Sequence, residues 1–262
     1  MGAVTAQLTR LSALAGNGAG LPGVAALPVL PALEGLLPGG LPRGTVVATG
    51  GWSLLCLALA AGASTAGAWC AIAGVPHLGV AAAAGVGLDP GRVLLVPDPG
   101  PRWPEVAVSL LAGCELVLLR PPGRPGAAVR KRLEASLRLC GGVLIVAGEW
   151  EGAAATLLVA HQSWEGIGYG YGRLMARRAQ VVASVRGAAR PRSRWLLLPG
   201  LDGSVNLADR VIAGDRDMRD TGLSAAPCPH ALQLAGLRAA GGWGWRWRAG
   251  LGPPAVRLPA GL

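Results

Sequence analysis

The stretch from Gly44 to Leu88 contains no aspartate, glutamate, lysine or arginine. An uncharged stretch of this length is typical of a membrane span or of a core segment that is buried from water on both sides. Glycines interrupt it repeatedly, and strand-like and helix-like patterns alternate between them. We therefore expect a buried α/β core here and no membrane span.

Strand and helix patterns alternate from Arg43 to Ala147. Short apolar runs bounded by glycine predict strands, and longer periodic segments predict helices. The predicted strands are 45–48, 69–73, 92–96, 115–119 and 143–147, and the predicted helices are 53–66, 78–85, 104–111 and 127–139. Because the strands are continuously apolar, this order predicts an α/β fold with a mostly parallel central sheet flanked by helices.

The pattern changes after Trp150, where strands follow one another without a full helix between them. This predicts an antiparallel extension at one end of the sheet, joined by a glycine- and aromatic-rich connection at 164–173. The strands expected there are 156–159, 181–185 and 195–198. We divide the chain into an N-terminal appendage that packs on the core (1–43), the core itself (44–200) and a partly irregular C-terminal tail (201–262).

The first core strand leads through a glycine turn into a helix, which is the scaffold on which P-loop proteins hold nucleotide phosphates. The turn consists of Gly50, Gly51, Trp52 and Ser53, which is short for the motif G-x-x-x-x-G-K-[ST]. Trp52 stands where that motif requires small residues and a lysine, and the one lysine of the chain, Lys131, lies far downstream. We interpret the turn as a degenerate nucleotide site and expect neither a cofactor nor catalytic residues.

Several segments together carry a resemblance to a known family. Strand, turn and helix follow Arg43-Gly44, and after them come WCAI at 69–72, ELVLL at 115–119, GVLIV at 142–146 and ARRAQVVASVR at 176–186. In this order they resemble the RecA ATPase core, a P-loop-type fold. More closely, residues 40–200 resemble the degenerate RecA-like accessory proteins of the ImuA type, from the mycobacterial and actinobacterial mutasome. Relatives of the division inhibitor SulA share part of this core and are a competing assignment.

Two further positions depart from the RecA pattern. RecA proteins carry a catalytic glutamate just after the second strand, whereas residues 74–77 contain no carboxylate. Their fourth strand ends in an aspartate that helps to hold magnesium, whereas here Arg120 follows the strand. An arginine repels the cation that a carboxylate attracts. The resemblance therefore implies a protein that does not hydrolyse ATP, and we expect no metal site.

The chain is strongly basic, with a formal net charge of +10, and its arginines concentrate in one block. No acidic residue lies between Glu165 and Asp202. Positive charge and aromatic rings on a glycine-rich backbone are typical of single-stranded nucleic acid binding. The alternative is a solvated strand face with a basic linker. The predicted DNA-contacting residues are Arg173, Arg177, Arg178, Arg186, Arg190, Arg192 and Arg194, together with Tyr169 and Tyr171.

The C-terminal tail contains a second aromatic and basic segment, GGWGWRWR at 241–248. In an extended chain, alternation places Trp243, Trp245 and Trp247 on one side, and Arg246 and Arg248 on the other. Tryptophan and arginine are the residue types that most often anchor protein interfaces. We expect these five residues to bind a protein partner. A strand that folds back on the domain and a membrane-surface contact are the alternatives.

The five cysteines are odd in number and widely spaced, and no C-x-x-C pair occurs. This pattern predicts neither a zinc site nor a disulfide framework, and most of these thiols lie in apolar segments where burial in reduced form is the default. No signal peptide is evident. We expect a cytoplasmic, nucleoid-associated protein.

The functional hypothesis is a non-catalytic RecA-like scaffold in SOS-type DNA damage tolerance. The resemblance implies two partners, an inactive Y-family polymerase-like protein and an error-prone replicative-type polymerase, which this chain would help to assemble for translesion synthesis. DNA contact and self-association are further expectations. A SulA-like cell-division inhibitor that binds a tubulin-like GTPase, or a divergent active ATPase, are the alternatives.

Overall fold

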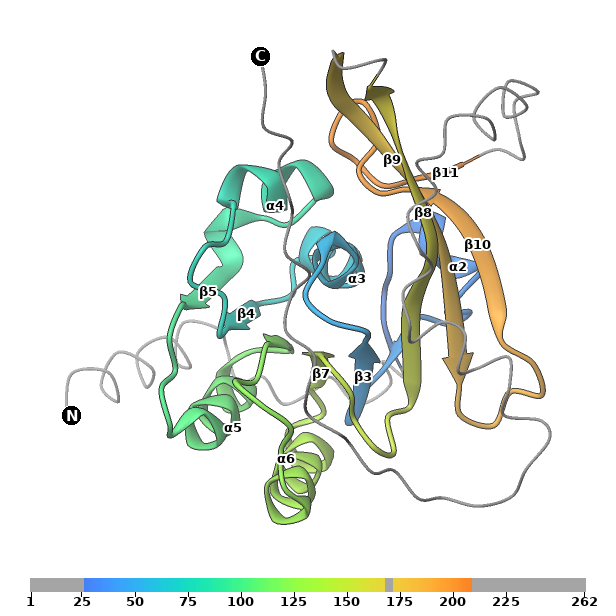
Figure 1. Ribbon diagram of the computed structural model, residues 1–262. Coiled ribbons are helices and arrows are strands. Elements are labelled where there is room, and N and C mark those ends of the chain that lie inside the picture. Colours follow the sequence, from blue (N-terminus) through green and yellow to red (C-terminus); the bar gives the residue numbers. More distant parts are fainter. Residues whose placement is uncertain (1–25, 168–171, 209–262) are drawn as a thin grey trace, which may run out of the picture.

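The computed structural model describes residues 26–167 and 172–208 (Figure 1). Tyr169, Tyr171 and the tryptophan segment of the tail lie outside these residues. Within them the chain forms an α/β fold with a mixed, largely parallel central sheet flanked by helices. The predicted fold class is confirmed at this level.

The central sheet has nine strands in the order β11-β10-β9-β8-β3-β7-β6-β4-β5. Pairing is parallel from β8 through to β5. The inner strands β3, β4, β6 and β7 are mostly buried because helices cover both of their faces, whereas the edge strand β5 is only partly buried. The five predicted parallel strands are confirmed as β3 (Thr45–Thr49), β4 (Cys70–Ala73), β5 (Val93–Val96), β6 (Leu116–Leu119) and β7 (Val143–Ala147).

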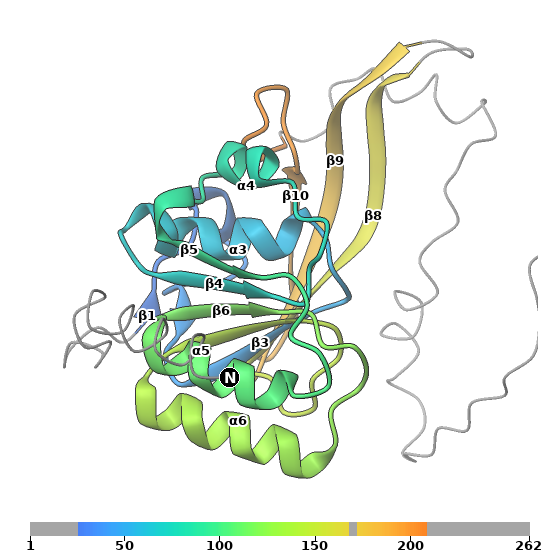
Figure 2. The same cartoon turned by 90° about the vertical axis from the view of Figure 1, so that its left-hand side faces the viewer.

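Helices cover the parallel half in two layers, with α3 and α4 on one face and α5 and α6 on the other (Figure 2). The predicted helices are confirmed with small shifts at their ends. Proline and glutamate in the first turn begin α5, and Gly141, with a φ of 68°, ends α6 in the left-handed region. The helices are α3 (Leu54–Thr65), α4 (Val80–Val86), α5 (Trp103–Gly113) and α6 (Ala127–Cys140), with a 3₁₀ turn, η1 (Pro90–Arg92), before β5.

The antiparallel extension is confirmed, but its first two strands are far longer than predicted. β8 (Ala155–Ile167) and β9 (Gly172–Val185) form a ribbon that projects past the rest of the sheet (Figure 2). The prediction of a loop at 164–173 was wrong, because backbone pairing continues through this polar, glycine-rich sequence as far as Ile167 and Gly172. A β-bulge near Ala160 lets the ribbon bend as it leaves the core.

The sheet also continues beyond Gly200. β10 (Arg192–Leu197) pairs with β9, and β11 (Asn206–Leu207) adds an edge strand to β10. Val205, which precedes β11, is buried in the core. The first residues after Gly200 are therefore part of the folded sheet.

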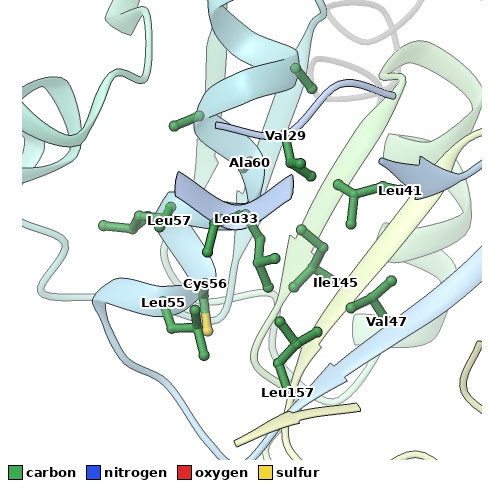
Figure 3. Close-up of a cluster of buried hydrophobic side chains, with 14 of the residues drawn as sticks. Val29, Leu33, Leu41, Val47, Leu55, Cys56, Leu57, Ala60, Ile145 and Leu157 are labelled. Carbon is green, nitrogen blue, oxygen red and sulfur yellow. The ribbon is translucent and has the colours of Figure 1, made fainter. Parts of the chain in front are cut away.

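Residues 26–43 pack on the face of the sheet that α3 covers. They form β1 (Ala26–Leu27), α2 (Pro31–Glu34) and β2 (Leu41–Pro42). Figure 3 shows side chains from this segment, from α3 and from the strands meeting in one cluster. The labelled members are Val29, Leu33, Leu41, Val47, Leu55, Cys56, Leu57, Ala60, Ile145 and Leu157.

Candidate functional site

The degenerate turn lies at the carboxyl end of β3, where α/β proteins usually hold their ligands. Thr49 is 2% exposed, and its Oγ1 donates to the carbonyl oxygens of Gly51 at 3.1 Å and Val146 at 3.2 Å. The amide of Gly148 donates to the carbonyl of Thr49 at 3.0 Å. These bonds tie the turn to the end of β7 and hold it close to the sheet.

Apolar side chains crowd the space around the turn. Trp52 is half-buried and packs against the core cluster on the α3 face. A Cβ on Gly50 would lie 2.8 Å from Cδ2 of Leu158, and Gly51 has a φ of 152°, which favours glycine. An indole and a leucine side chain therefore lie beside this turn.

The other two altered strand ends lie on the same edge of the sheet, on neighbouring strands. Gly74 follows β4 and Arg120 follows β6, and a Cβ on Gly74 would lie 2.1 Å from the carbonyl oxygen of Arg120. The amide of Arg120 donates to the carbonyl of Ala73 at 2.9 Å, while its side chain is exposed. Within residues 26–167 and 172–208, no three His, Cys, Asp or Glu side chains come together to hold a metal ion.

The structure divides the predicted arginine block between the two faces of the ribbon. Arg177 and Arg178 are consecutive on β9, so their side chains point to opposite faces. Arg177 pairs in register with Trp164 of β8, and Arg178 with Leu197 of β10. The block therefore does not form one continuous basic surface.

Arg177 contacts an aromatic ring and an amide on its face. Its guanidinium carbon lies 6.0 Å from the centroid of the Trp164 ring, within the range of a cation–π contact, and Nη2 donates to Oε1 of Gln162. Partial burial lowers the pKa of the Arg177 guanidinium. The group still carries its charge at neutral pH, because an arginine pKa lies far above 7.

A matching pair forms on the opposite face, where the guanidinium carbon of Arg178 lies 5.7 Å from the centroid of the Trp195 ring. Trp164 and Trp195 are both exposed. Sequence reasoning placed neither tryptophan in the site. Trp195 was only an aromatic residue in a predicted strand, and Trp164 only the first residue of the aromatic-rich connection. The arginine that each ring meets depends on the strand register.

The other predicted arginines occupy separate places. Register places Arg192 opposite Ala183 and Arg194 opposite Val181, on the face of Arg177. Arg194 packs against the end of α2, since a Cβ on Gly35 would lie 2.6 Å from its Nε. Arg194 nevertheless remains exposed. The other exposed arginines of the block are Arg173 near the tip of the ribbon, and Arg186, Arg190 and Arg192 around the connection from β9 to β10.

The described cysteines are free thiols, as predicted. Cys56, Cys70 and Cys114 are buried, and Cys140 is half-buried. Burial raises the pKa of Cys70 and of Cys114 to about 12, so both thiols stay protonated at neutral pH. A neutral, buried thiol is a poor nucleophile and a poor metal ligand.

One comparison with known proteins covers most of the parallel half of the fold. The family described as the MT3502 N-terminal domain matches residues 35–152. An uncharacterized protein of Mycobacterium tuberculosis, Rv3395c, is 39% identical over 127 residues, which is 47% of this chain and 62% of that protein. The matched family region ends before β8, so the arginine-bearing ribbon lies beyond it. In the part of the chain that the structure describes, no helix is both long and apolar enough to cross a membrane.

Proposed function

We propose that this chain is a non-catalytic RecA-like scaffold in SOS-type DNA damage tolerance, and that it contacts DNA through the β8–β9–β10 ribbon. The resemblance over residues 40–200 suggests that it helps to assemble an error-prone translesion synthesis complex. Its partners would be an inactive Y-family polymerase-like protein and an error-prone replicative-type polymerase. The mutasome role rests on this resemblance, and the DNA contact rests on the ribbon.

The strand arrangement supports a RecA-like core. β3, which precedes the degenerate turn, lies inside the sheet between β7 and β8. Parallel strands continue outward on one side, and the antiparallel β9 follows β8 on the other. In the proposal, this order is that of a nucleotide-binding core whose central turn has Trp52 and no lysine.

The observation that carries the DNA contact is the pair of arginine–tryptophan contacts on the ribbon. Each places a cation beside an exposed ring, so one site offers both phosphate neutralisation and a surface for base stacking. The ribbon projects beyond the helices that cover the parallel half (Figure 2).

The purified full-length protein is expected to release no phosphate from ATP above a blank reaction, with or without single-stranded DNA. The turn lacks the lysine that neutralises the transferring phosphoryl group, and Arg120 stands where a metal-binding carboxylate is needed. A phosphate-release assay measures this. DNA-stimulated release that disappears in a Gly51→Val variant would contradict the prediction.

Reversing the charge of the ribbon with Arg177→Glu and Arg178→Glu is expected to weaken DNA binding to a similar degree on all sequences. Phosphate contacts carry no sequence information, and each one lost lowers the slope of log K against log salt by about 0.7 to 0.9. Fluorescence anisotropy at several salt concentrations measures both quantities. Thermal denaturation of the variant shows whether the half-buried Arg177 is also needed for folding.

The matched control is Arg92→Glu with Arg132→Glu, which changes the net charge equally. Both arginines lie in exposed ion pairs, with Asp89 and Glu105, away from the ribbon. Exposed pairs contribute little to stability, so this variant should fold and keep its affinity for DNA. Equal weakening by both variants would show that only overall charge matters, and unchanged binding in the ribbon variant would remove the ribbon from the mechanism.

Affinity purification after DNA damage, followed by mass spectrometry, tests the assembly role. Recovery of the two polymerase-type partners supports the scaffold. Recovery of a tubulin-like GTPase in their place, with direct inhibition of its polymerisation, would favour a SulA-like inhibitor.

A further inference from the structure

A basic cavity lies at the opposite edge of the sheet from the degenerate turn. Its volume is about 670 Å³, within the range of small-molecule sites. Its walls are α6, the start of β3 and the crossover from β7 to β8, with Arg186 at the end of β9. In Figure 1, α6 lies below β3 and β7 on this side of the molecule.

Two of the arginines that line the cavity are already neutralised. Arg43 donates through Nη2 to Oε2 of Glu115 at 2.8 Å, and through Nη1 to the carbonyl of Gly141 at 3.4 Å. Arg130 donates through Nη2 to Oε2 of Glu151 at 2.6 Å. These bonds build the wall and fix its shape, and they leave no excess charge.

Three other cations around the same cavity have no carboxylate partner among the described residues: Lys131, Arg138 and Arg186. The guanidinium of Arg186 donates through Nη2 to the carbonyl of Ala153 at 3.3 Å, which leaves its charge without a carboxylate within the described part of the chain. On α6, the spacing alone would let Glu134 pair with Arg130 or Arg138. In the fold, Glu134 instead accepts a hydrogen bond from Nε1 of the buried Trp150 at 3.0 Å.

From this arrangement we infer that the cavity binds phosphate groups. In the described part of the chain, three cations without an ion pair line two sides of this concave space, against one carboxylate without an ion pair, Glu134, so the site has an excess of positive charge. Charge-assisted hydrogen bonds from arginine and lysine are the usual means of holding phosphate. The phosphates would belong to a free nucleotide or polyphosphate, or to the backbone of a nucleic acid. This inference goes beyond the proposed function and does not rest on the ribbon.

The test uses the full-length protein with three probes: inorganic pyrophosphate, ATP and a short fluorescein-labelled single strand. Calorimetry for the first two and anisotropy for the third measure the dissociation constants at low salt. Lys131→Gln with Arg138→Gln is expected to raise the dissociation constant by about tenfold or more. The variant removes two cations, and each charge-assisted hydrogen bond to phosphate contributes to the affinity. Both side chains are without ion pairs in the described fold, so the variant should remain folded.

Arg186→Gln removes a cation from the opposite wall and should weaken the same probe. The control, Arg92→Gln with Arg132→Gln, removes two positive charges away from the cavity, one of them from α6 itself, and should leave the dissociation constant unchanged. If the cavity variants bind pyrophosphate and ATP more weakly, the ligand is a free phosphate compound. If they bind only the single strand more weakly, the ligand is the phosphate backbone of a nucleic acid. The inference is overturned if no probe binds, or if the control weakens binding as much as the cavity variants.

Because the ribbon variant Arg177→Glu with Arg178→Glu leaves Lys131 and Arg138 in place, it should still bind pyrophosphate or ATP in the cavity. If the unmodified protein binds pyrophosphate or ATP but not DNA, the cavity inference stands and the proposed DNA contact is wrong. The two proposals can therefore fail separately.

Discussion

Replacing Gly62 with alanine is expected to lower the free energy of unfolding by about 3 kcal/mol, the upper part of the usual range for overpacking. Gly62 lies inside α3, where the N-terminal segment crosses the helix. A Cβ there would lie 2.3 Å from the carbonyl carbon and 2.5 Å from the Cα of Val29, and 2.7 Å from the amide nitrogen of Leu30. These are backbone atoms, so the clash is relieved only by moving the whole segment.

The matched control is Gly85→Ala in α4. There the nearest atom to an added Cβ is the carbonyl oxygen of Gly203 at 3.9 Å, which is an ordinary contact. Alanine in a helix interior is favoured over glycine by about 0.8–1 kcal/mol, so this variant should be more stable than the parent. Chemical denaturation measures the free energy of unfolding of both variants, which should fall in Gly62→Ala and rise in Gly85→Ala. A Gly62→Ala protein as stable as the Gly85→Ala protein would show that the segment does not rest on α3.

The second large effect is expected for Leu33→Ala, which should cost about 2–5 kcal/mol of unfolding free energy. Leu33 is 0% exposed and belongs to the same buried cluster as α3 and the central strands (Figure 3). Truncating it leaves a cavity among side chains that are themselves held by the sheet. Denaturant titration followed by circular dichroism measures the loss.

Leu139→Ala is the comparison for Leu33→Ala, because Leu139 is 90% exposed near the end of α6. A surface substitution of this kind usually changes stability by less than about 0.5 kcal/mol. If both variants lose the same small amount, the segment before β3 is an appendage that unfolds apart from the core. A large loss in Leu33→Ala alone makes residues 26–43 part of one cooperative unit.

These two predictions show where sequence reasoning was weakest. The run from Leu54 to Thr65 is apolar on every side, and ten of its residues are buried, so its pattern indicates a buried helix but not what covers each face. The residues before β3 have little periodicity of their own. Only the packing shows that a side chain larger than that of glycine does not fit at position 62, because the backbone of Val29 and Leu30 passes directly over it.

The candidate site shows the same division. The absence of a lysine, the short turn and the excess of arginine can be predicted from composition and local order. The pairs Arg177 with Trp164 and Arg178 with Trp195 could not, because they depend on the register of strands. A one-residue slip in register would move every side chain of a strand to the other face.

The sequence alone determined the five parallel strands, the helices that cover them and the antiparallel strands that follow, because apolar periodicity and glycine boundaries are local signals. The tertiary structure decided how far β8 and β9 extend, since polar and glycine-rich residues form a ribbon when a partner strand satisfies their backbone groups. It also decided which charges remain unpaired. Glu134 accepts a hydrogen bond from Trp150, because partners distant in the chain compete with those one helical turn away. Among residues 26–167 and 172–208, Lys131 and Arg138 therefore have no carboxylate partner beside the cavity.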